Sequence, residues 1–138
     1  MMVWDEVSYG NIEGARAISI KHSDRATIRY CQASPKTLSV SHVWAHGAGG
    51  RPHTGMNACL HARLVQLARE IECDSYRMDT PCIPENHELR SEAVANINGI
   101  FTVSRMTLIW DTDIMSIDIS DGSIEKMETL FSVLLVCD

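Results

Sequence analysis

Thr37-Leu38-Ser39-Val40-Ser41-His42-Val43-Trp44 is the stretch of sequence that decides the fold. Leu38, Val40, His42 and Trp44 occupy every second position, with Ser or Val between them. A period of two places alternate side chains on opposite faces of a β-strand. The stretch therefore predicts a strand that ends near Trp44, with these four residues on one face.

A helix is predicted after this strand, beyond the glycine-rich loop of residues 46–53. Apolar residues recur there at spacings of four and three, the pattern of a helix that faces a core. The residues of this stripe are Met56, Leu60, Leu64, Leu67 and Ile71. Strand, loop and helix in this order predict the first half of a βαβ unit.

The rest of the chain repeats strand and helix twice more. Alternation in residues 75–79 predicts a short strand, and the apolar residues from Leu89 to Phe101 predict a second helix. The apolar run from Met106 to Trp110 predicts a strand that is covered on both faces. A third helix is expected to begin after Ser123, its N-cap residue, and to include Leu134.

Residues 1–35 predict a β-hairpin that extends this α/β core. Two short alternating runs, 17–21 and 27–31, flank a polar turn at residues 22–25. Alternating strands and helices indicate a mostly parallel sheet flanked by helices and joined by right-handed crossovers. We therefore predict one α/β domain over residues 1–138, with the hairpin of residues 1–35 as its extension.

Composition narrows the class of protein. Hydrophobic residues make up 45% and charged residues 22% of the 138 residues, as in ordinary globular domains. A net charge of −6 and the lack of a Lys/Arg run argue against a nucleic-acid partner. The longest apolar run, residues 130–137, is far shorter than the roughly twenty residues of a membrane helix, so no membrane partner is expected.

The cysteines and the N-terminus indicate a cytoplasmic protein. None of the five cysteines forms a CxxC pair, so neither a disulfide framework nor a zinc ribbon is indicated. The first residues lack the basic and then apolar pattern of a signal peptide. Reduced thiols in the cytoplasm are therefore expected.

Polar residues gather where the predicted strands end. The three groups are His42 with Trp44 and His46, Asp79 with Cys82, and Asp111 with Asp113. Ligands of such sheets bind beyond the carboxyl ends of the strands. We therefore predict a site at this edge, with His42, Asp79 and Asp111 as candidate catalytic residues.

Cys82, His42 and Asp79 have the types needed for a thiol nucleophile, its base and an orienting acid. Cysteines of this kind are more often packed and unreactive, and no known local signature surrounds Cys82. We expect Cys82 to be largely buried. We also expect His42 and Asp79 to lie within hydrogen-bonding reach, directly or through a water.

The histidines and the glycine-rich loop have plainer interpretations than a metal or phosphate site. The candidate ligands are His42, His46, His53, His61 and Cys59. No pair among them has a recognised zinc spacing, so no metal is expected. Residues 47–51 lack both phosphate-loop signatures, so a flexible connector is favoured over an anion cradle with Arg51.

Paired acidic residues also occur twice. Glu85 and Glu88 suit the first turn of a helix, where carboxylates stabilise the helix dipole. Asp111 and Asp113 suit a solvated loop, although their place after the third strand keeps them as candidates.

Residues 37–44 resemble the opening motif of the heterokaryon-incompatibility (HET) domain family, a strand that ends in Ser-(Tyr/His)-Val-Trp before a glycine-bearing loop. Residues 76–84, Tyr-Arg-Met-Asp-Thr-Pro-Cys-Ile-Pro, are similar to the family's second motif, Trp-Ile-Asp-x-x-Cys-Ile. Residues 88–90 and 98–101 resemble its third motif, and residues 106–111 match the strand that comes next. Order and spacing agree from about residue 37 onward.

The chain departs from the HET pattern in several places. Tyr76 stands where tryptophan is usual, Arg77 replaces an apolar residue, and Pro81 precedes Cys82. Residues 45–47 replace the usual Gly or Asp-Gly. The family continues into an Arg-x-Trp-x-x-Gln-Glu motif, which would begin beyond Asp138, so we expect a truncated chain or a shortened family member.

The resemblance implies a fold and a function. HET domains are similar to TIR domains, which implies a three-layer flavodoxin-like sheet. It implies an intracellular signalling or self-recognition module of programmed cell death or immunity, which associates with itself or with a partner domain. The motif residues implied to bind a ligand are Ser41, Trp44, Gly47, Cys82 and Glu88.

Two alternatives stay open. Some TIR domains cleave NAD, which implies an NAD glycohydrolase with NAD as substrate and no cofactor. The glutamate for that reaction would belong to the motif beyond Asp138, so association is expected rather than catalysis. The third reading is an inactive fragment that keeps the fold.

Overall fold

The computed structural model describes residues 1–21, 26–42, 49–111, 120 and 122–125. By compactness the chain divides into two units, residues 1–108 and residues 109–138, and each is considered by itself. The first unit contains the predicted site residues from Ser41 to Glu88, whereas Asp111 belongs to the second. One domain over residues 1–138 stays a prediction.

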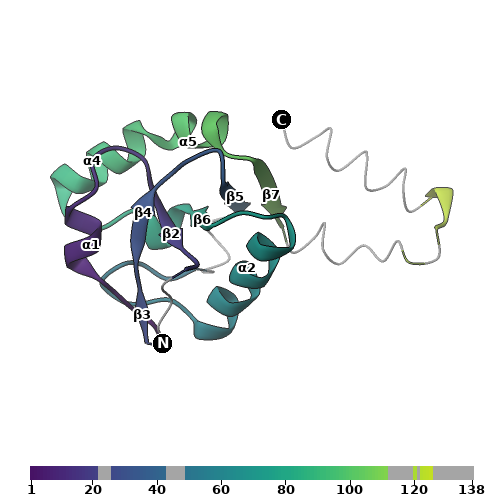
Figure 1. Ribbon diagram of the computed structural model, residues 1–138, viewed down its shortest axis with the longest axis horizontal. Coiled ribbons are helices and arrows are strands. Elements are labelled where there is room, and N and C mark those ends of the chain that lie inside the picture. The colour runs from purple at the N-terminus through teal and green to yellow at the C-terminus, as the bar shows by residue number, and fades with distance from the viewer. Residues whose placement is uncertain (22–25, 43–48, 112–119, 121, 126–138) are drawn as a thin grey trace. The chain divides into compact units, whose positions relative to one another are not determined.

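A five-stranded mixed sheet forms the centre of the fold (Figure 1). Its strand order is β4 (Tyr30–Gln32), β2 (Arg16–Ser19), β6 (Ser75–Met78), β5 (Thr37–His42) and β7 (Met106–Trp110). β5 and β6 run parallel, whereas β2 runs antiparallel to both of its neighbours. The α/β class is confirmed, but the prediction of a mostly parallel sheet is wrong, because the hairpin strand β2 pairs directly with β6.

The predicted hairpin is part of this sheet rather than an extension of it. Ala17 pairs with Cys31, and Ile18 pairs with Tyr30 on one side and Tyr76 on the other. Ala17 and Ile18 are both fully buried, so β2 has apolar neighbours on both faces and suits an interior position. The turn predicted at residues 22–25 lies outside the described residues.

A second, two-stranded sheet joins the start of the chain to the second hairpin segment. β1 (Val3–Trp4) pairs in parallel with β3 (Thr27–Ile28). The short helix α1 (Glu6–Gly10) follows β1, and Asp5 caps it by accepting a hydrogen bond from the Ser8 amide. Tyr9 of α1 is fully buried, and its ring contacts the rings of Trp4 and Tyr30 edge-on.

Helix α2 (Ala58–Glu70) confirms the first predicted helix. Asn57 caps it, since its side-chain oxygen accepts hydrogen bonds from two first-turn amides. The residues that α2 buries are His61, Leu64, Val65 and Ala68. The buried face of α2 therefore differs from the predicted apolar stripe. Leu60 of that stripe is only half-buried, whereas His61 is buried and forms a hydrogen bond with Tyr76.

The second predicted helix is two helices, α4 (His87–Ala95) and α5 (Ile97–Val103). They are separated at Asn96, whose side chain donates a hydrogen bond back to the Glu92 carbonyl. Such side-chain bonds to the backbone compete with helix continuation. One further turn, α3 (Asp79–Cys82), begins directly after β6, so the predicted strand ends one residue earlier than expected.

Strand β7 has the predicted limits but not the predicted burial. Met106 is 53% exposed and Ile109 is 50% exposed, so a strand covered on both faces is contradicted for these residues. β7 stands at the end of the strand order, beside β5, and an end position covers a strand less than a central one does. The third predicted helix lies almost wholly outside the described residues, which include only Ile124 and Glu125 of it as helix.

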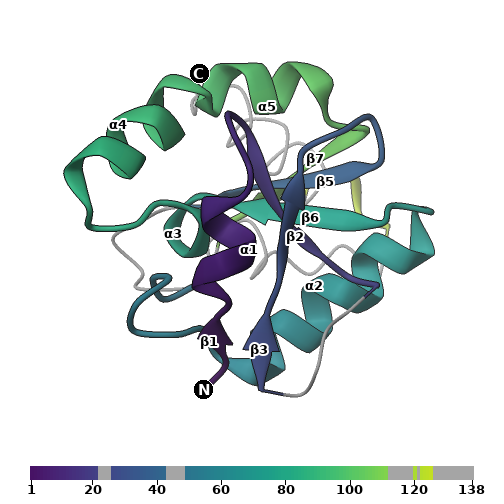
Figure 2. The ribbon, with the colours of Figure 1, turned by 60° about the vertical axis from the view of Figure 1, so that its left-hand side comes forward.

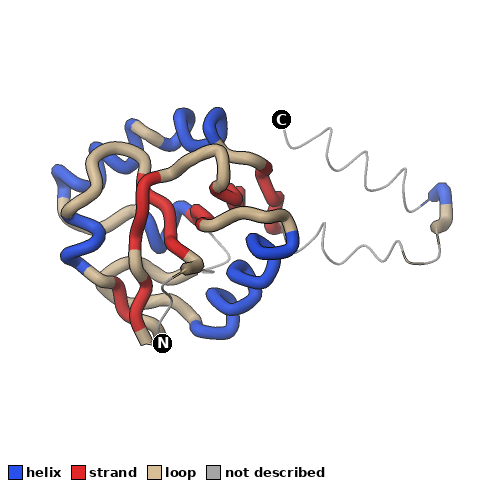
Figure 3. Tube along the Cα trace, in the orientation of Figure 1, coloured by secondary structure: helices blue, strands red, loops and turns tan. Residues whose placement is uncertain are grey.

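Helices lie on two sides of the parallel strands in the first unit. In Figures 1 and 2, α4 and α5 lie above β5 and β6, and α2 lies below them. Figure 3 shows the strands gathered between the helices. In the described part of the chain, no helix has the length and apolar character needed to cross a membrane.

Candidate functional site

The parallel pairing of β5 and β6 brings two predicted site segments to one edge of the sheet. Val40 pairs with Met78, so the same register continued by two residues sets His42 level with Thr80. The imidazole Nε2 of His42 lies 3.4 Å from Thr80 Oγ1. Asp79 precedes Thr80 and therefore lies at the same edge, as the sequence predicted.

His42 is a half-buried imidazole with one nitrogen enclosed by protein. Burial lowers the pKa of His42 below its usual 6.5, while the charge of Asp79 and the backbone of Val40 act to raise it. Its Nδ1 is buried and has no hydrogen-bond partner among the described residues. Burial therefore favours the neutral form of the His42 imidazole. A hydrogen bond to Asp79, direct or through a water, stays a prediction.

Asp79 is paired with a buried arginine. Arg77 Nη2 lies 3.5 Å from Asp79 Oδ1, and the two side chains are 2% and 15% exposed. Arg77 Nη1 donates a hydrogen bond of 2.9 Å to the Arg16 carbonyl. The 3.5 Å contact of Nη2 with Asp79 lacks the alignment of a hydrogen bond. In the described part of the chain, both Nε and Nη2 of Arg77 are buried without a hydrogen-bond partner. In the part of the chain that the structure describes, Asp79 is the carboxylate that lies within ion-pair distance of this guanidinium.

Cys82 is a packed thiol, as predicted. It is fully buried, and burial raises its pKa from 9.0 to about 11. Tyr9 donates a hydrogen bond of 2.8 Å to the Cys82 carbonyl, and Tyr30 donates one of 2.6 Å to the Pro81 carbonyl. These bonds fix α3 against α1 and β4. A neutral thiol without access to solvent is a poor nucleophile, so Cys82 serves packing in this structure.

Of the remaining predicted site residues, Ser41 and Glu88 are described within the first unit. Ser41 is half-buried beside His42 on β5, while Glu88 is exposed in the first turn of α4. Asp111 belongs to the second unit, so its position is not related to the edge of β5 and β6. Trp44 and Gly47 lie outside the described residues.

The chain returns to this edge at Gly49, which the sequence did not single out as a contact. Gly49 has φ of 95°, a conformation that favours glycine. A Cβ at this position would collide with Thr80 Oγ1 and would lie 3.0 Å from Met78 Sδ. Gly49 therefore packs directly on the residue that contacts His42. The double glycine was the available signal for this close approach.

Arg77 and Thr80 are the site residues that sequence reasoning missed. Arg77 was read as a departure from an apolar position, yet it supplies the charge beside Asp79. Thr80 carries no chemical signal of its own, and only the pairing register places it against His42.

Two of the proposed histidine ligands have other partners. His53 Nε2 lies 3.0 Å from Glu85 Oε1, and His61 Nδ1 lies 2.7 Å from the Tyr76 hydroxyl. His46 lies outside the described residues. Among the residues that are described, no three His, Cys, Asp or Glu side chains cluster as metal ligands would.

Comparisons with known proteins give no match for this chain among family models, curated proteins or solved structures.

Proposed function

We propose that this chain is a HET-like signalling or self-recognition module of a cell-death or immune response, which acts through association of domains. The observation that carries the proposal is the role of the motif residues. Cys82 is fully buried, and Asp79 is engaged by the buried Arg77. Residues of the second motif thus hold the framework together and do not present a nucleophile.

The finer fold is part of the same proposal. A flavodoxin-like or TIR-like three-layer arrangement is supported by the parallel strands β5 and β6 with α2 between them in sequence. Figures 1 and 2 place helices above and below these two strands. The antiparallel β2 and β4 are additions at one side of such a sheet.

Association needs an exposed surface, and apolar side chains are present on two helices of the first unit. Val7 on α1 is 72% exposed, and Val94 on α4 is 47% exposed. Single exposed apolar residues are common, but they are the first positions at which a contact between copies is tested. Self-association is therefore the form in which the proposal is tested.

One observation favours the alternative, an NAD glycohydrolase. His42 and Asp79 lie at one edge of the sheet, and the charge of Asp79 acts on the imidazole of His42. A neutral imidazole beside a carboxylate is a usual pair for proton transfer. For this alternative, the catalytic glutamate that the TIR resemblance implies is not identified among the described residues.

The discriminating experiment incubates the purified chain with NAD and follows nicotinamide by chromatography. We expect no release above the rate without protein. Release that is lost in both His42→Ala and Asp79→Ala, with exposed Glu13→Gln as the unaffected control, would replace the association proposal with the enzyme. Because Asp79→Ala also disturbs Arg77, folding of each variant is checked by circular dichroism.

A further inference from the structure

Asn98 and Gly99 form the one Asn-Gly pair of the sequence, whereas the other four asparagines precede alanine, histidine or isoleucine. In such a pair the glycine amide nitrogen can attack the side-chain carbonyl carbon of the asparagine. Glycine permits this attack because it has no Cβ to obstruct the approach and its backbone adopts conformations closed to other residues. Both residues lie in α5 and are exposed to solvent. The pair is therefore chemically distinct from the other asparagines of the chain.

The amide of Gly99 has no backbone acceptor in the described part of the chain. The hydrogen bond that begins α5 joins the Ile100 amide to the Asn96 carbonyl at 3.1 Å. The amides that precede Ile100 in α5 belong to those that a helix leaves without an intrahelical partner. The side chain of Asn96 does not cap them. No hydrogen bond of the Gly99 amide therefore has to break before its nitrogen can react.

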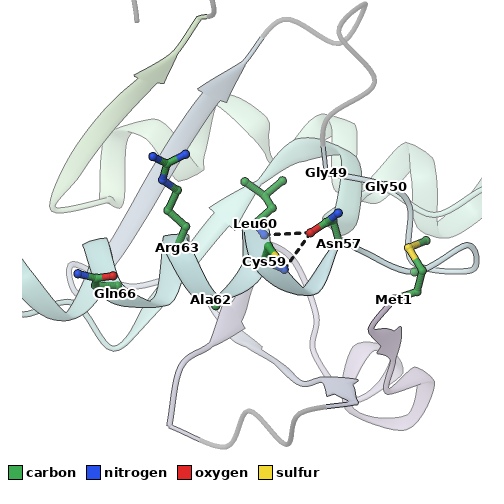
Figure 4. Close-up of a pocket in the computed structure, with 10 residues that line it drawn as sticks. Met1, Gly49, Gly50, Asn57, Cys59, Leu60, Ala62, Arg63 and Gln66 are labelled. Atoms are coloured by element: carbon green, nitrogen blue, oxygen red, sulfur yellow. Dashed lines mark hydrogen bonds between the residues drawn. The ribbon is translucent and has the colours of Figure 1, made fainter.

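The side chain of Asn98 is free to turn as well. Its main-chain carbonyl accepts a hydrogen bond of 3.0 Å from the Thr102 hydroxyl, but over the described ranges its side-chain amide makes none. Asn57 is different, although it is also exposed. Its Oδ1 accepts hydrogen bonds from the Cys59 and Leu60 amides at 2.8 and 3.2 Å, drawn as dashed lines in Figure 4. Asn57 is thus held in place, and Asn98 is not.

The surroundings of Gly99 leave room for a change of backbone conformation. A Cβ built at this position would meet nothing within 4 Å. A helical backbone keeps the glycine nitrogen away from the preceding side chain, so the attack requires the start of α5 to open. Only seven residues form α5, and glycine weakens a helix relative to alanine. Short helix ends of this kind open locally without unfolding of the core.

We propose that Asn98-Gly99 is a site of spontaneous covalent modification, with water as the co-reactant. The Gly99 nitrogen bonds to Asn98 Cγ and gives up its proton, the Cγ–Nδ2 bond breaks, and the side-chain amino group leaves with that proton as ammonia. Water then opens the cyclic imide at either of its two carbonyls. The products are aspartate and isoaspartate at position 98, and each adds one negative charge at this exposed position.

The two products differ in their effect on α5. In the isoaspartate product the main chain runs through Cγ, which inserts one carbon inside the ring closed by the hydrogen bond between Ile100 and Asn96. Ile100 is the buried residue of α5, so the change reaches the packing of this helix. The aspartate product keeps the main chain and leaves α5 intact. The proposal is independent of the association function, because it uses none of the residues at the edge of β5 and β6.

The test incubates the native chain in mildly alkaline buffer over several days, with the chain unfolded in guanidinium as the positive control. Peptide mapping by mass spectrometry follows the replacement of NH₂ by OH at each asparagine, and chromatography separates the aspartate and isoaspartate peptides. We expect conversion at Asn98 and none at Asn57. Gly99→Ala should slow conversion at least about fivefold, because alanine stabilises the helix and its Cβ obstructs the nitrogen. Since that Cβ meets no neighbour, the variant should fold, which circular dichroism verifies.

Amide hydrogen exchange tests the effect on α5. The Ile100 amide should exchange faster in the isoaspartate fraction than in the unmodified chain, whereas Asn98→Asp should leave its exchange unchanged. An Asn98 that stays unmodified in the native chain while the unfolded chain converts would overturn the proposal. Equal conversion at Asn57, or an equal rate in Gly99→Ala, would overturn it as well.

Discussion

At the residue scale, the pair formed by Arg77 and Asp79 is the strongest electrostatic feature of the site. We expect Asp79→Asn to destabilise the fold by about 3 kcal/mol, because it leaves the guanidinium of Arg77 buried without a counter-charge. Urea unfolding measures the change in the free energy of unfolding. The control is Arg77→Met combined with Asp79→Asn, which removes both charges and should recover part of the loss. If the double variant loses as much free energy of unfolding as Arg77→Met and Asp79→Asn lose together, the two charges are not coupled.

Two of the free cysteines, one exposed and one fully buried, provide a direct test of the packing at the site. Cys59 is exposed and Cys82 is fully buried with its pKa raised to about 11. We expect a thiol reagent to label Cys59 rapidly in the native protein and to leave Cys82 unlabelled until unfolding. Peptide mapping by mass spectrometry identifies the labelled cysteine. Native labelling of Cys82 at the rate of Cys59 would contradict the packed thiol.

Buried histidines make stability depend on pH. Burial lowers the pKa of His61 below 6.5, its value in the unfolded chain, so the unfolded chain binds more protons as the pH falls. The contribution of neutral, buried His61 to the free energy of unfolding is fully present above pH 6.5. It is lost as the pH falls below 6.5 toward the lower pKa of His61 in the folded chain. Unfolding in urea at pH 7.5 and at about pH 5.5 measures this loss. His61→Gln should make the free energy of unfolding depend less on pH. His87→Gln, at an exposed position, should leave this dependence unchanged.

At the element scale, Glu92 ties α4 to the start of β2. Its Oε1 accepts a hydrogen bond of 2.6 Å from the Gly14 amide, and its Oε2 lies 3.0 Å from Arg16 Nη1. These contacts, the Gly14 amide first, lower the pKa of Glu92 below 4.5, so their stabilisation is present above pH 4.5 and is lost as the pH falls further. We expect Glu92→Gln to cost about 1 kcal/mol at pH 7, since the carboxylate is partly exposed.

Glu88→Gln on the same helix is the matched control for this tie. Glu88 is exposed in the first turn of α4, so its replacement should change the free energy of unfolding little. Thermal unfolding at pH 7 and about pH 4 compares the two variants. Equal changes in stability for Glu92→Gln and Glu88→Gln would show that the contacts of Glu92 with Gly14 and Arg16 do not stabilise the fold.

The elements also show how far the sequence alone could predict the fold. The period of two found β5 and β6, although consecutive residues on both faces of these strands are buried, and the helical spacing found α2, which buries one face. The hairpin was found, but its pairing with β6 was not, since a long-range pairing has no local signal. The break at Asn96 was missed because it depends on one side-chain hydrogen bond to the backbone.

At the scale of the whole molecule, topology explains which of the predicted site segments lie together. His42 and Asp79 were predicted at one edge because parallel neighbours end together, and β5 and β6 are parallel neighbours. Thr80 and Arg77 could not be predicted, since their contacts depend on the tertiary fold, whereas the double glycine was a local signal for the close approach at Gly49. Glu88 is exposed in the first turn of α4.

The most direct test of the central claim is sedimentation velocity of the purified chain from about 1 to about 300 μM, a range that covers weak association. The association account predicts a sedimentation coefficient that rises with concentration. It predicts that Val94→Glu shifts this rise to higher concentration, while Asn98→Glu, which adds the same charge at an exposed position of α5, does not. A monomer over the whole range would contradict association as the function of this chain.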